Sequence, residues 1–235
     1  MMRIFLGCFL FLSVFKGLSQ EVPFSIDTLH VKIDSLYRED QFYAGINYNS
    51  IITKPVGVSQ NKISFGFSAG FLRDIPLNKS RTLAIAPGIG LSFDNYIQNM
   101  AIVGSGKNPI YGVIPSNVDY SKNRFEKWRV EVPIEFRWRT STPEEFTFFR
   151  IYGGFKFSYL LSDKSVFDDG IQKIVIKNNK DFEEFLYGVY LSIGYSSFNL
   201  QVYYGLNNLF KPSAQIDSVP IKMDILSIGI VFYIL

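Results

Sequence analysis

The run from Arg129 to Arg139 alternates strictly between two kinds of side chain. Odd positions carry a charge or a proline, and even positions carry Val130, Val132, Ile134, Phe136 and Trp138. Because successive side chains of a β-strand point to opposite faces, one face of this run is ionic and the other is large and apolar. In the other strand-like runs the positions between the apolar ones are often Gly, Ala or Ser, which suits a crowded interior. Polar and small residues inside with apolar residues outside are typical of a transmembrane β-barrel.

The first residues have the pattern of an export signal. Arg3 is followed by the apolar stretch 4–15 and by the small residues Gly17 and Ser19, which is the order that a signal peptidase recognises. We therefore expect a signal peptide at 1–19. The stretch is shorter than the roughly 20 apolar residues of a membrane-spanning helix, and too few residues separate Arg3 from Cys8 for a lipoprotein signal.

Loss of this segment changes the charge and the chemistry of the chain. It removes Arg3, Lys16 and the only cysteine, so that the 24 basic residues fall to 22 against 21 acidic ones. The mature chain has no basic excess with which to bind nucleic acid. It also has no disulfide and no cysteine site.

From Gln41 onward the chain contains eight strand-like runs, each with the roughly 9 to 11 residues that a tilted membrane strand needs. They are approximately 41–52, 62–73, 81–102, 123–140, 147–162, 182–195, 198–210 and 221–235. Long and short connections alternate between them, as they must when every second turn lies at the same membrane face. Short turns mark the periplasmic side of such barrels. We therefore predict an all-β, eight-stranded antiparallel transmembrane β-barrel over 41–235 in the cell outer membrane, with both termini periplasmic.

The remaining mature residues, 20–40, form a periplasmic lead-in whose apolar spacing fits a helix or a strand. Within the barrel, Asp169-Gly170 is a hairpin signal, so the third long loop should be a ribbon that projects from the rim. Ser196-Ser197 should close the tightest hairpin.

Aromatic residues make up 17% of the chain, and many lie near predicted strand ends. Rings of this kind commonly form girdles at the two membrane interfaces. We expect the following rings to share the lipid-facing side with the apolar positions: Tyr43, Tyr96, Trp128, Trp138, Phe148, Phe149, Tyr159, Tyr195, Phe198, Phe210 and Tyr233.

The inward face of the fourth and fifth runs carries charges of both signs. They are Arg129, Glu131, Glu135, Arg137, Arg139, Arg150 and Lys156. This set is either a binding or conduction site, or a plug of paired charges. Eight strands leave an interior only wide enough for side chains, and pairing allows charges to be buried, so we favour the plug. With so many arginines nearby, Glu131 and Glu135 should be salt-bridged and not poised as acid and base.

No catalytic constellation is evident in the sequence. The only histidine is His30, in the lead-in, whereas enzymes on small outer-membrane barrels place a histidine beside Ser or Asp at the outer rim. No cluster of His and Cys suits a metal. We therefore predict no enzyme activity, no cofactor and no metal, and the sequence identifies no small-molecule substrate.

Five stretches carry a more specific pattern. They are E-F-R-W-R-T-S-T-P-E-E at 135–145, the run 149–160, G-Y-S-S-F-N at 194–199 with Y-Y-G-L-N at 203–207, the C-terminal 229–235, and the turn 71–76. In these stretches, which cover most of 41–235, the chain resembles the PorT/SprT-like outer-membrane proteins of the type IX secretion system of Bacteroidota. The resemblance implies an accessory component that assists export or maturation of cargo with C-terminal sorting signals. Its expected partners are outer-membrane lipid and other secretion components.

The short turn between the fourth and fifth runs is the candidate partner contact. Its residues are Ser141, Thr142, Pro143, Glu144 and Glu145. The turn is more distinctive than a hairpin needs, although Pro143 could be present only to fix its shape. Two other functions compete with a role in secretion. One is a structural or adhesive small barrel whose outer loops bind a ligand, and the other is a lipid-modifying enzyme, which the absence of a rim histidine disfavours.

Overall fold

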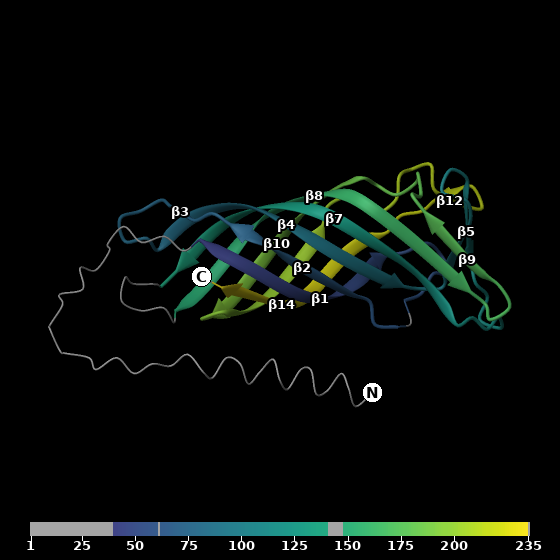
Figure 1. Cartoon of the computed structure of the whole chain (residues 1–235), viewed down its shortest axis with the longest axis horizontal. Coiled ribbons are helices and arrows are strands. Elements are labelled where there is room, and N and C mark those ends of the chain that lie inside the picture. Colours follow the sequence, from purple (N-terminus) through teal and green to yellow (C-terminus); the bar gives the residue numbers. More distant parts are fainter. Residues whose placement is uncertain (1–39, 61, 141–147, 235) are drawn as a thin grey trace, which may run out of the picture. The chain divides into compact units, whose positions relative to one another are not determined.

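The chain forms a closed ring of eight antiparallel strands (Figure 1). The structure is a computed structural model that describes residues 40–60, 62–140 and 148–234. Around the ring, the strands are β1 (Gln41–Thr53), β2 (Phe65–Leu72), β4 (Leu83–Ile97), β7 (Lys122–Arg139), β8 (Phe149–Asp168), β10 (Phe185–Tyr195), β11 (Phe198–Gly205) and β14 (Asp224–Ile234). The first and last strands, β1 and β14, pair with each other and close the ring. The predicted eight-stranded barrel is confirmed.

In the described residues, six shorter strands lie outside the ring. They are β3 (Ile75–Pro76), β5 (Met100–Gly104), β6 (Pro109–Val113), β9 (Lys173–Lys177), β12 (Gln215–Ile216) and β13 (Val219–Pro220). β9 pairs with the far end of β8, and Gly170 has a φ of 89° in the turn between them. The projecting ribbon is therefore present. The two-residue turn after Tyr195 is present as well, with Ser196 at a φ of 54°.

One predicted strand is divided in two. The run 81–102 leaves the ring after β4, and β5 pairs only with β6. At the break, side-chain amides replace strand partners: Gln98 donates to the Met100 carbonyl at 2.9 Å and Asn123 donates to the Gln98 carbonyl at 2.7 Å. These bonds satisfy the backbone groups where the chain turns out of the ring.

Other strand limits differ from the prediction because of neighbouring elements. The fifth strand continues to Asp168, six residues beyond the predicted end at 162, because β7 and β9 pair with it there. A β-bulge at Trp128/Arg129 shifts the register between β7 and β8, so that Arg129 pairs with Leu160 and Trp128 with Ser162. The seventh strand ends at Gly205, before the predicted 210.

The alternation along β7 divides its side chains between two environments. Odd residues from Asn123 to Arg139 are buried, whereas Trp128, Val132, Phe136 and Trp138 are between 41% and 53% exposed on the outside. The other ring strands repeat this arrangement with Phe, Ile, Leu and Tyr outside. An apolar exterior around a polar interior is what a lipid environment requires.

The two ends of the barrel differ. β1 begins and β14 ends at the end with the short turns, whereas β5, β9 and β12 lie at the opposite end with the long connections (Figure 1). The predicted signal peptide, all of the lead-in except Asp40, and the turn 141–145 lie outside the described residues. Within the described ranges, no helix is long and apolar enough to cross a membrane.

Candidate functional site

A buried charge cluster fills the barrel near the short turns. β7 brings Glu135, Arg137 and Arg139 to the inside, and the turn after β2 brings Asp74 to meet them. Arg139 donates two hydrogen bonds to the Asp74 carboxylate, at 2.8 and 2.9 Å. Arg137 donates to Asp74 at 3.0 Å and to Glu135 at 2.9 Å. Both guanidiniums therefore contact carboxylates while almost fully buried, as charges in a low-dielectric interior must.

These contacts determine the pKa of Asp74. Burial alone would raise the pKa of the Asp74 carboxyl, but hydrogen bonds and positive charge from Arg139 and Arg137 outweigh burial and hold the pKa below its usual value. Asp74 is therefore ionised at neutral pH. It joins the turn at the short-turn end to the interior face of β7.

The two inward-facing glutamates of β7, Glu131 and Glu135, contact tyrosines and a lysine. Tyr233 donates to Glu135 at 2.8 Å, and Tyr43 donates to Glu131 at 2.6 Å. Lys156 lies 3.4 Å from the other oxygen of Glu131. Both carboxylates are therefore engaged by neighbouring donors, and Glu135 also accepts from Arg137.

Arg150 is held by aromatic rings. Its guanidinium lies 4.4 Å from the Phe148 ring centroid and 5.8 Å from that of Tyr233, within the range of cation–π attraction. In the described part of the chain, its Nε and one terminal nitrogen have no hydrogen-bond partner. The cations from β7 and β8 thus outnumber the acids at this end, and rings compensate for the difference.

A second group of charges lies further toward the long connections. Lys127 is fully buried, with its ammonium 3.8 Å from the Phe182 ring centroid and 3.3 Å from the Leu209 carbonyl. Arg129 donates to the Glu183 carbonyl at 3.4 Å. Between the two groups is a cavity of about 60 Å³, whose polar lining includes Asp94, Arg129 and Glu131. Such a volume holds only a few water molecules.

Above this level the long connections form a hydrophobic core across the barrel mouth. It is made of residues from all four long connections together with the strand ends that they join. Its buried members include Val58, Met100, Ile102, Tyr111, Ile176, Phe182, Leu209, Phe210 and Ile221. A charged layer and a hydrophobic layer therefore fill the interior in succession. The arrangement suits neither a channel nor a substrate pocket.

The structure shows where the seven charged residues predicted for the interior lie. Arg129, Glu131, Glu135, Arg137, Arg139 and Arg150 are buried, and Lys156 is partly buried beside Glu131. Sequence reasoning missed Asp74, Asp94 and Lys127. Each had a signal: Lys127 continues the odd positions of the run 129–139, Asp94 continues the inward positions Gly88, Gly90 and Ser92, and Asp74 follows inward Leu72 by two residues.

The predicted aromatic girdle is partly wrong. Trp128, Trp138, Phe149, Tyr159, Tyr195 and Phe198 are exposed on the outside, but Tyr43, Tyr96, Phe148, Phe210 and Tyr233 are at most 7% exposed. The physical reason is that these five fill the interior. Tyr43 and Tyr233 donate to buried carboxylates there. Strand parity assigns Tyr43, Tyr96 and Tyr233 to the inside, whereas Phe148 precedes β8 and Phe210 belongs to the hydrophobic core of the long connections.

No group of three or more His, Cys, Asp or Glu side chains that could hold a metal occurs in the described ranges. The candidate contact turn, Ser141, Thr142, Pro143, Glu144 and Glu145, lies outside those ranges, as does His30. Its geometry is therefore not part of the site described above.

Comparisons with known proteins agree with the architecture. The family model described as "Outer membrane protein beta-barrel domain" matches residues 19–211. No curated protein matches the chain. Among solved structures, the chain is similar to Ail, the attachment invasion locus protein of Yersinia pestis, with 16% identity over 83% of this chain and 99% of that chain and a TM-score of 0.35. Ail in complex with the heparin analogue sucrose octasulfate gives 12% identity over 82% of this chain and 97% of that chain, with a TM-score of 0.30.

Proposed function

This chain belongs to the family of outer membrane protein β-barrel domains, and we propose that it is a non-enzymatic barrel that binds a protein partner outside the cell through its long connections. The filled interior supports a role at the surface of the barrel, because in the described residues no passage or substrate pocket crosses the two layers. In this proposal the long connections are extracellular and both termini are periplasmic, as in other barrels of this kind.

The observation that carries the proposal is an exposed aliphatic side chain on every long connection. The residues and their exposed fractions are Val56 (99%), Ile171 (97%), Val219 (64%), Ile110 (62%) and Val118 (43%). These tips lie beyond the lipid-facing band, on connections that share a hydrophobic core. Single exposed aliphatic residues are common, but their presence on all four connections supports a surface for protein binding.

A groove between two of these connections adds to that surface. Its volume is about 600 Å³, and its walls come from the β1–β2 connection, with Gly57 and Lys62, and from the segment before β7, with Val118 and Tyr120. Apolar and polar groups both line it, as in the concave sites that accept side chains of a partner. An ordered groove flanked by aliphatic tips favours a protein partner over a flat electrostatic contact.

Cysteine labelling tests the orientation. Because Cys8 is the only cysteine of the chain, a variant with one new cysteine reports on one position. Ile171→Cys at the ribbon tip, where the side chain is 97% exposed, should react with a membrane-impermeant maleimide on intact cells. Lys79→Cys, in the opposite turn, should react only after lysis. The reverse result would contradict the proposed orientation.

Adherence tests the function. Cells that carry the wild-type protein should bind to other cells or to immobilised extracellular proteins more strongly than cells lacking the gene. The triple variant Val56→Ser, Ile171→Ser, Val219→Ser should fall to the level of the deletion. A control with Ser105→Ala, Asn117→Ala and Ser218→Ala changes polar tips and should keep wild-type adherence. Full adherence of the aliphatic-tip variant would remove this function.

A role as an accessory component of type IX secretion is the second candidate. It is supported by the resemblance in 135–145 and the other stretches to PorT/SprT-like proteins. If the protein has this role, loss of the gene should leave cargo in the periplasm. Replacement of Glu144 and Glu145 together should impair export, whereas His30→Ala should not. Wild-type secretion in the deletion strain would exclude this role, and adhesion predicts that outcome.

A further inference from the structure

The ribbon formed by β7, β8 and β9 carries a concentration of cations on its outward face. Three rows of paired residues cross this face beyond Trp128: Glu126, Lys164 and Lys177; then Arg124, Val166 and Val175; then Lys122, Asp168 and Lys173. The nine positions hold five basic and two acidic residues, and Val166 at their centre is only 4% exposed. We call them the basic ribbon face.

The basic ribbon face continues the lipid-facing surface without interruption. Trp128 is on the same side of β7, is 49% exposed, and packs against Phe93 with ring centroids 5.0 Å apart. An exposed tryptophan at this level is typical of the membrane interface. Glu126 follows two residues further along β7, about 7 Å away by strand geometry, so the row of Lys164 and Lys177 begins where head groups replace acyl chains.

Charges within this face are compensated unequally. Asp168 lies between Lys122 and Lys173 in the strand register. Glu126 is opposite Lys164 in the register, but its carboxylate forms an ion pair with Arg124 at 2.7 Å. Lys164 and Lys177 are directly opposite each other, and in the described part of the chain neither forms an ion pair with a carboxylate. Like charges directly opposite on a β-ladder repel and destabilise it.

Protection of an open strand edge does not account for this arrangement. Lysines on an edge strand prevent unwanted pairing, and β9 is such a strand because it pairs only with β8. Lys164, however, lies on β8, which is paired on both sides at that position, and Arg124 and Lys122 lie on β7. A bound anion explains the cations on all three strands.

We propose that the basic ribbon face binds phosphate groups of lipids in the outer leaflet, with the ammonium groups of Lys164 and Lys177 sharing one phosphate. The shared anion removes the repulsion between the two lysines, and Arg124, Lys122 and Lys173 extend the contact along the ribbon. The inference rests on the proposed orientation, in which this end of the barrel is extracellular.

A binding experiment on the full-length folded protein in detergent tests the site. The probe is lipid A with two phosphates, compared with dephosphorylated lipid A and with inorganic phosphate. For Lys164→Gln with Lys177→Gln, affinity for the phosphorylated lipid should fall about 25-fold, since each lysine near a lipid phosphate contributes about fivefold. Dephosphorylated lipid A should bind both proteins equally weakly, and inorganic phosphate should not substitute for the lipid.

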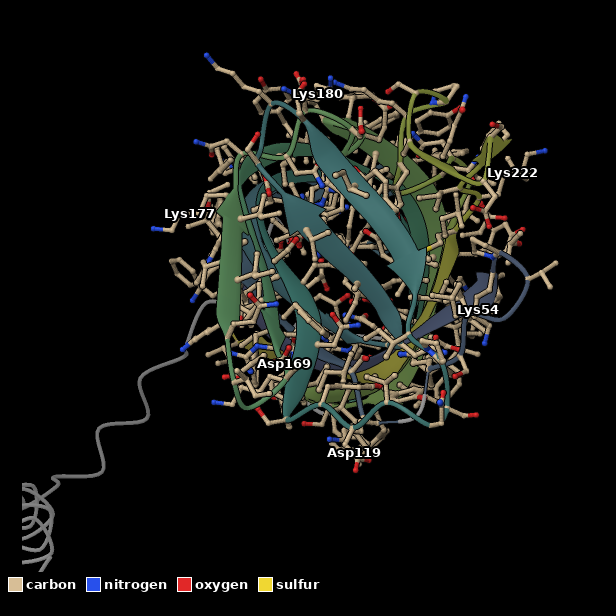
Figure 2. All side chains as sticks on the ribbon, turned by 90° about the vertical axis from the view of Figure 1, so that its right-hand side faces the viewer. Lys54, Asp119, Asp169, Lys177, Lys180 and Lys222 are labelled. Atoms are coloured by element: carbon tan, nitrogen blue, oxygen red, sulfur yellow. The ribbon has the colours of Figure 1, made fainter. Side chains whose placement is uncertain are left out.

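Matched variants distinguish a defined site from general charge. Lys54→Gln with Lys222→Gln removes the same charge from the other side of the same end (Figure 2) and should keep affinity within about twofold. Lys177→Arg should keep binding and also shows that the ribbon is folded. Unchanged affinity of the Lys164/Lys177 variant, an equal loss in the Lys54/Lys222 control, or equal binding of inorganic phosphate would each overturn the proposal.

This test is independent of the function proposed above. Lipid binding in detergent does not require a particular orientation in cells, whereas cysteine labelling does. The variant Val56→Ser with Val219→Ser should retain lipid binding even if it abolishes adherence. Conversely, adherence without lipid A binding would remove only the basic ribbon face.

Discussion

Arg137 and Arg139 are almost completely buried inside a barrel whose outside is apolar, and Asp74 contacts both of them. Removing one partner of a buried ion pair leaves a charge that neither water nor protein compensates, at a cost of about 3–5 kcal/mol. Asp74→Asn should therefore lower the free energy of unfolding by an amount in this range. Equilibrium urea unfolding in lipid vesicles measures it.

A nearby exposed pair provides the control. Arg73 and Asp40 lie 2.7 Å apart, but the Arg73 side chain is 52% exposed. Exposed pairs contribute about 0–1 kcal/mol, so Arg73→Gln should change stability by no more than about 1 kcal/mol. Equal effects of Asp74→Asn and Arg73→Gln would show that burial of the Asp74 cluster is not what makes it strong.

Lowering the pH should weaken the contact of Asp74 with Arg137 and Arg139. The pKa of Asp74 is lowered in the folded barrel, so its contribution to stability is present above the unfolded pKa of about 3.9. That contribution is lost as pH falls through the lower, folded pKa. Unfolding measured between about pH 6 and pH 2 should show a steeper loss for the wild type than for Asp74→Asn. Parallel pH profiles would contradict the assignment.

Parity along a strand predicts which residues point inward, but it does not predict what they touch. Alternation alone predicts that Arg137 and Arg139 face inward, and both side chains are buried. Their partner Asp74 lies 63 and 65 positions away in the chain, in a turn where alternation no longer applies. Such a contact depends on how β2 and β7 are placed around the ring, which one sequence does not specify.

Neighbouring strands approach closely where glycine faces the interior. Gly70 and Gly90 are paired across β2 and β4, and a Cβ on Gly90 would lie 2.1 Å from the Tyr43 hydroxyl and 2.7 Å from the Ala69 carbonyl oxygen. Gly90→Ala would thus displace Tyr43 from Glu131. We expect a loss of about 1–3 kcal/mol in unfolding free energy, as for other overpacked interiors.

Another strand glycine provides the comparison for that prediction. A Cβ on Gly153 would meet its nearest atoms at 3.6 Å, an ordinary contact distance. Gly153→Ala should therefore be nearly neutral in the same unfolding measurement. A loss as large as that of Gly90→Ala would mean that strand flexibility, and not the space around Tyr43, sets the cost.

The outward face of β7 should require apolar side chains, in contrast to its charged inward face. Val132 is 41% exposed on that face, and an arginine at the membrane midplane costs about 2–4 kcal/mol. Val132→Arg should lower stability in lipid vesicles by this amount, as measured by urea unfolding. Val56→Arg, on a long connection, should have little effect. Equal stability of Val132→Arg and the wild type would show that Val132 does not contact lipid.

Composition and alternation predicted the number of strands and their faces because lipid and a narrow interior impose a period of two. They did not predict where the third strand ends. The run 81–102 keeps its apolar character through Met100 and Ile102, but those residues join the hydrophobic core of the long connections. The sequence alone does not distinguish an apolar side chain that contacts lipid from one that is buried in protein.

On the scale of the whole molecule, we expect the barrel to be closed to ions. In its described residues, the charged and hydrophobic layers leave interior cavities of about 60 and 10 Å³. Purified protein inserted into a planar bilayer should give no steady single-channel current, while a large porin in the same bilayer conducts. Reproducible current steps from the wild type would mean that the hydrophobic layer opens. Loss of such steps after crosslinking the long connections would identify the gate.

The pairing of β1 with β14 has a consequence for biogenesis. These strands are the first and last of the ring, so the seam cannot form until the C-terminal residues have been synthesised and exported. Until then both edges expose unpaired backbone groups, which hydrocarbon does not tolerate. We therefore expect stable insertion to follow completion of the chain, and a stop codon before Asp224 should leave the edges of β1 and β11 unpaired and prevent closure of the ring.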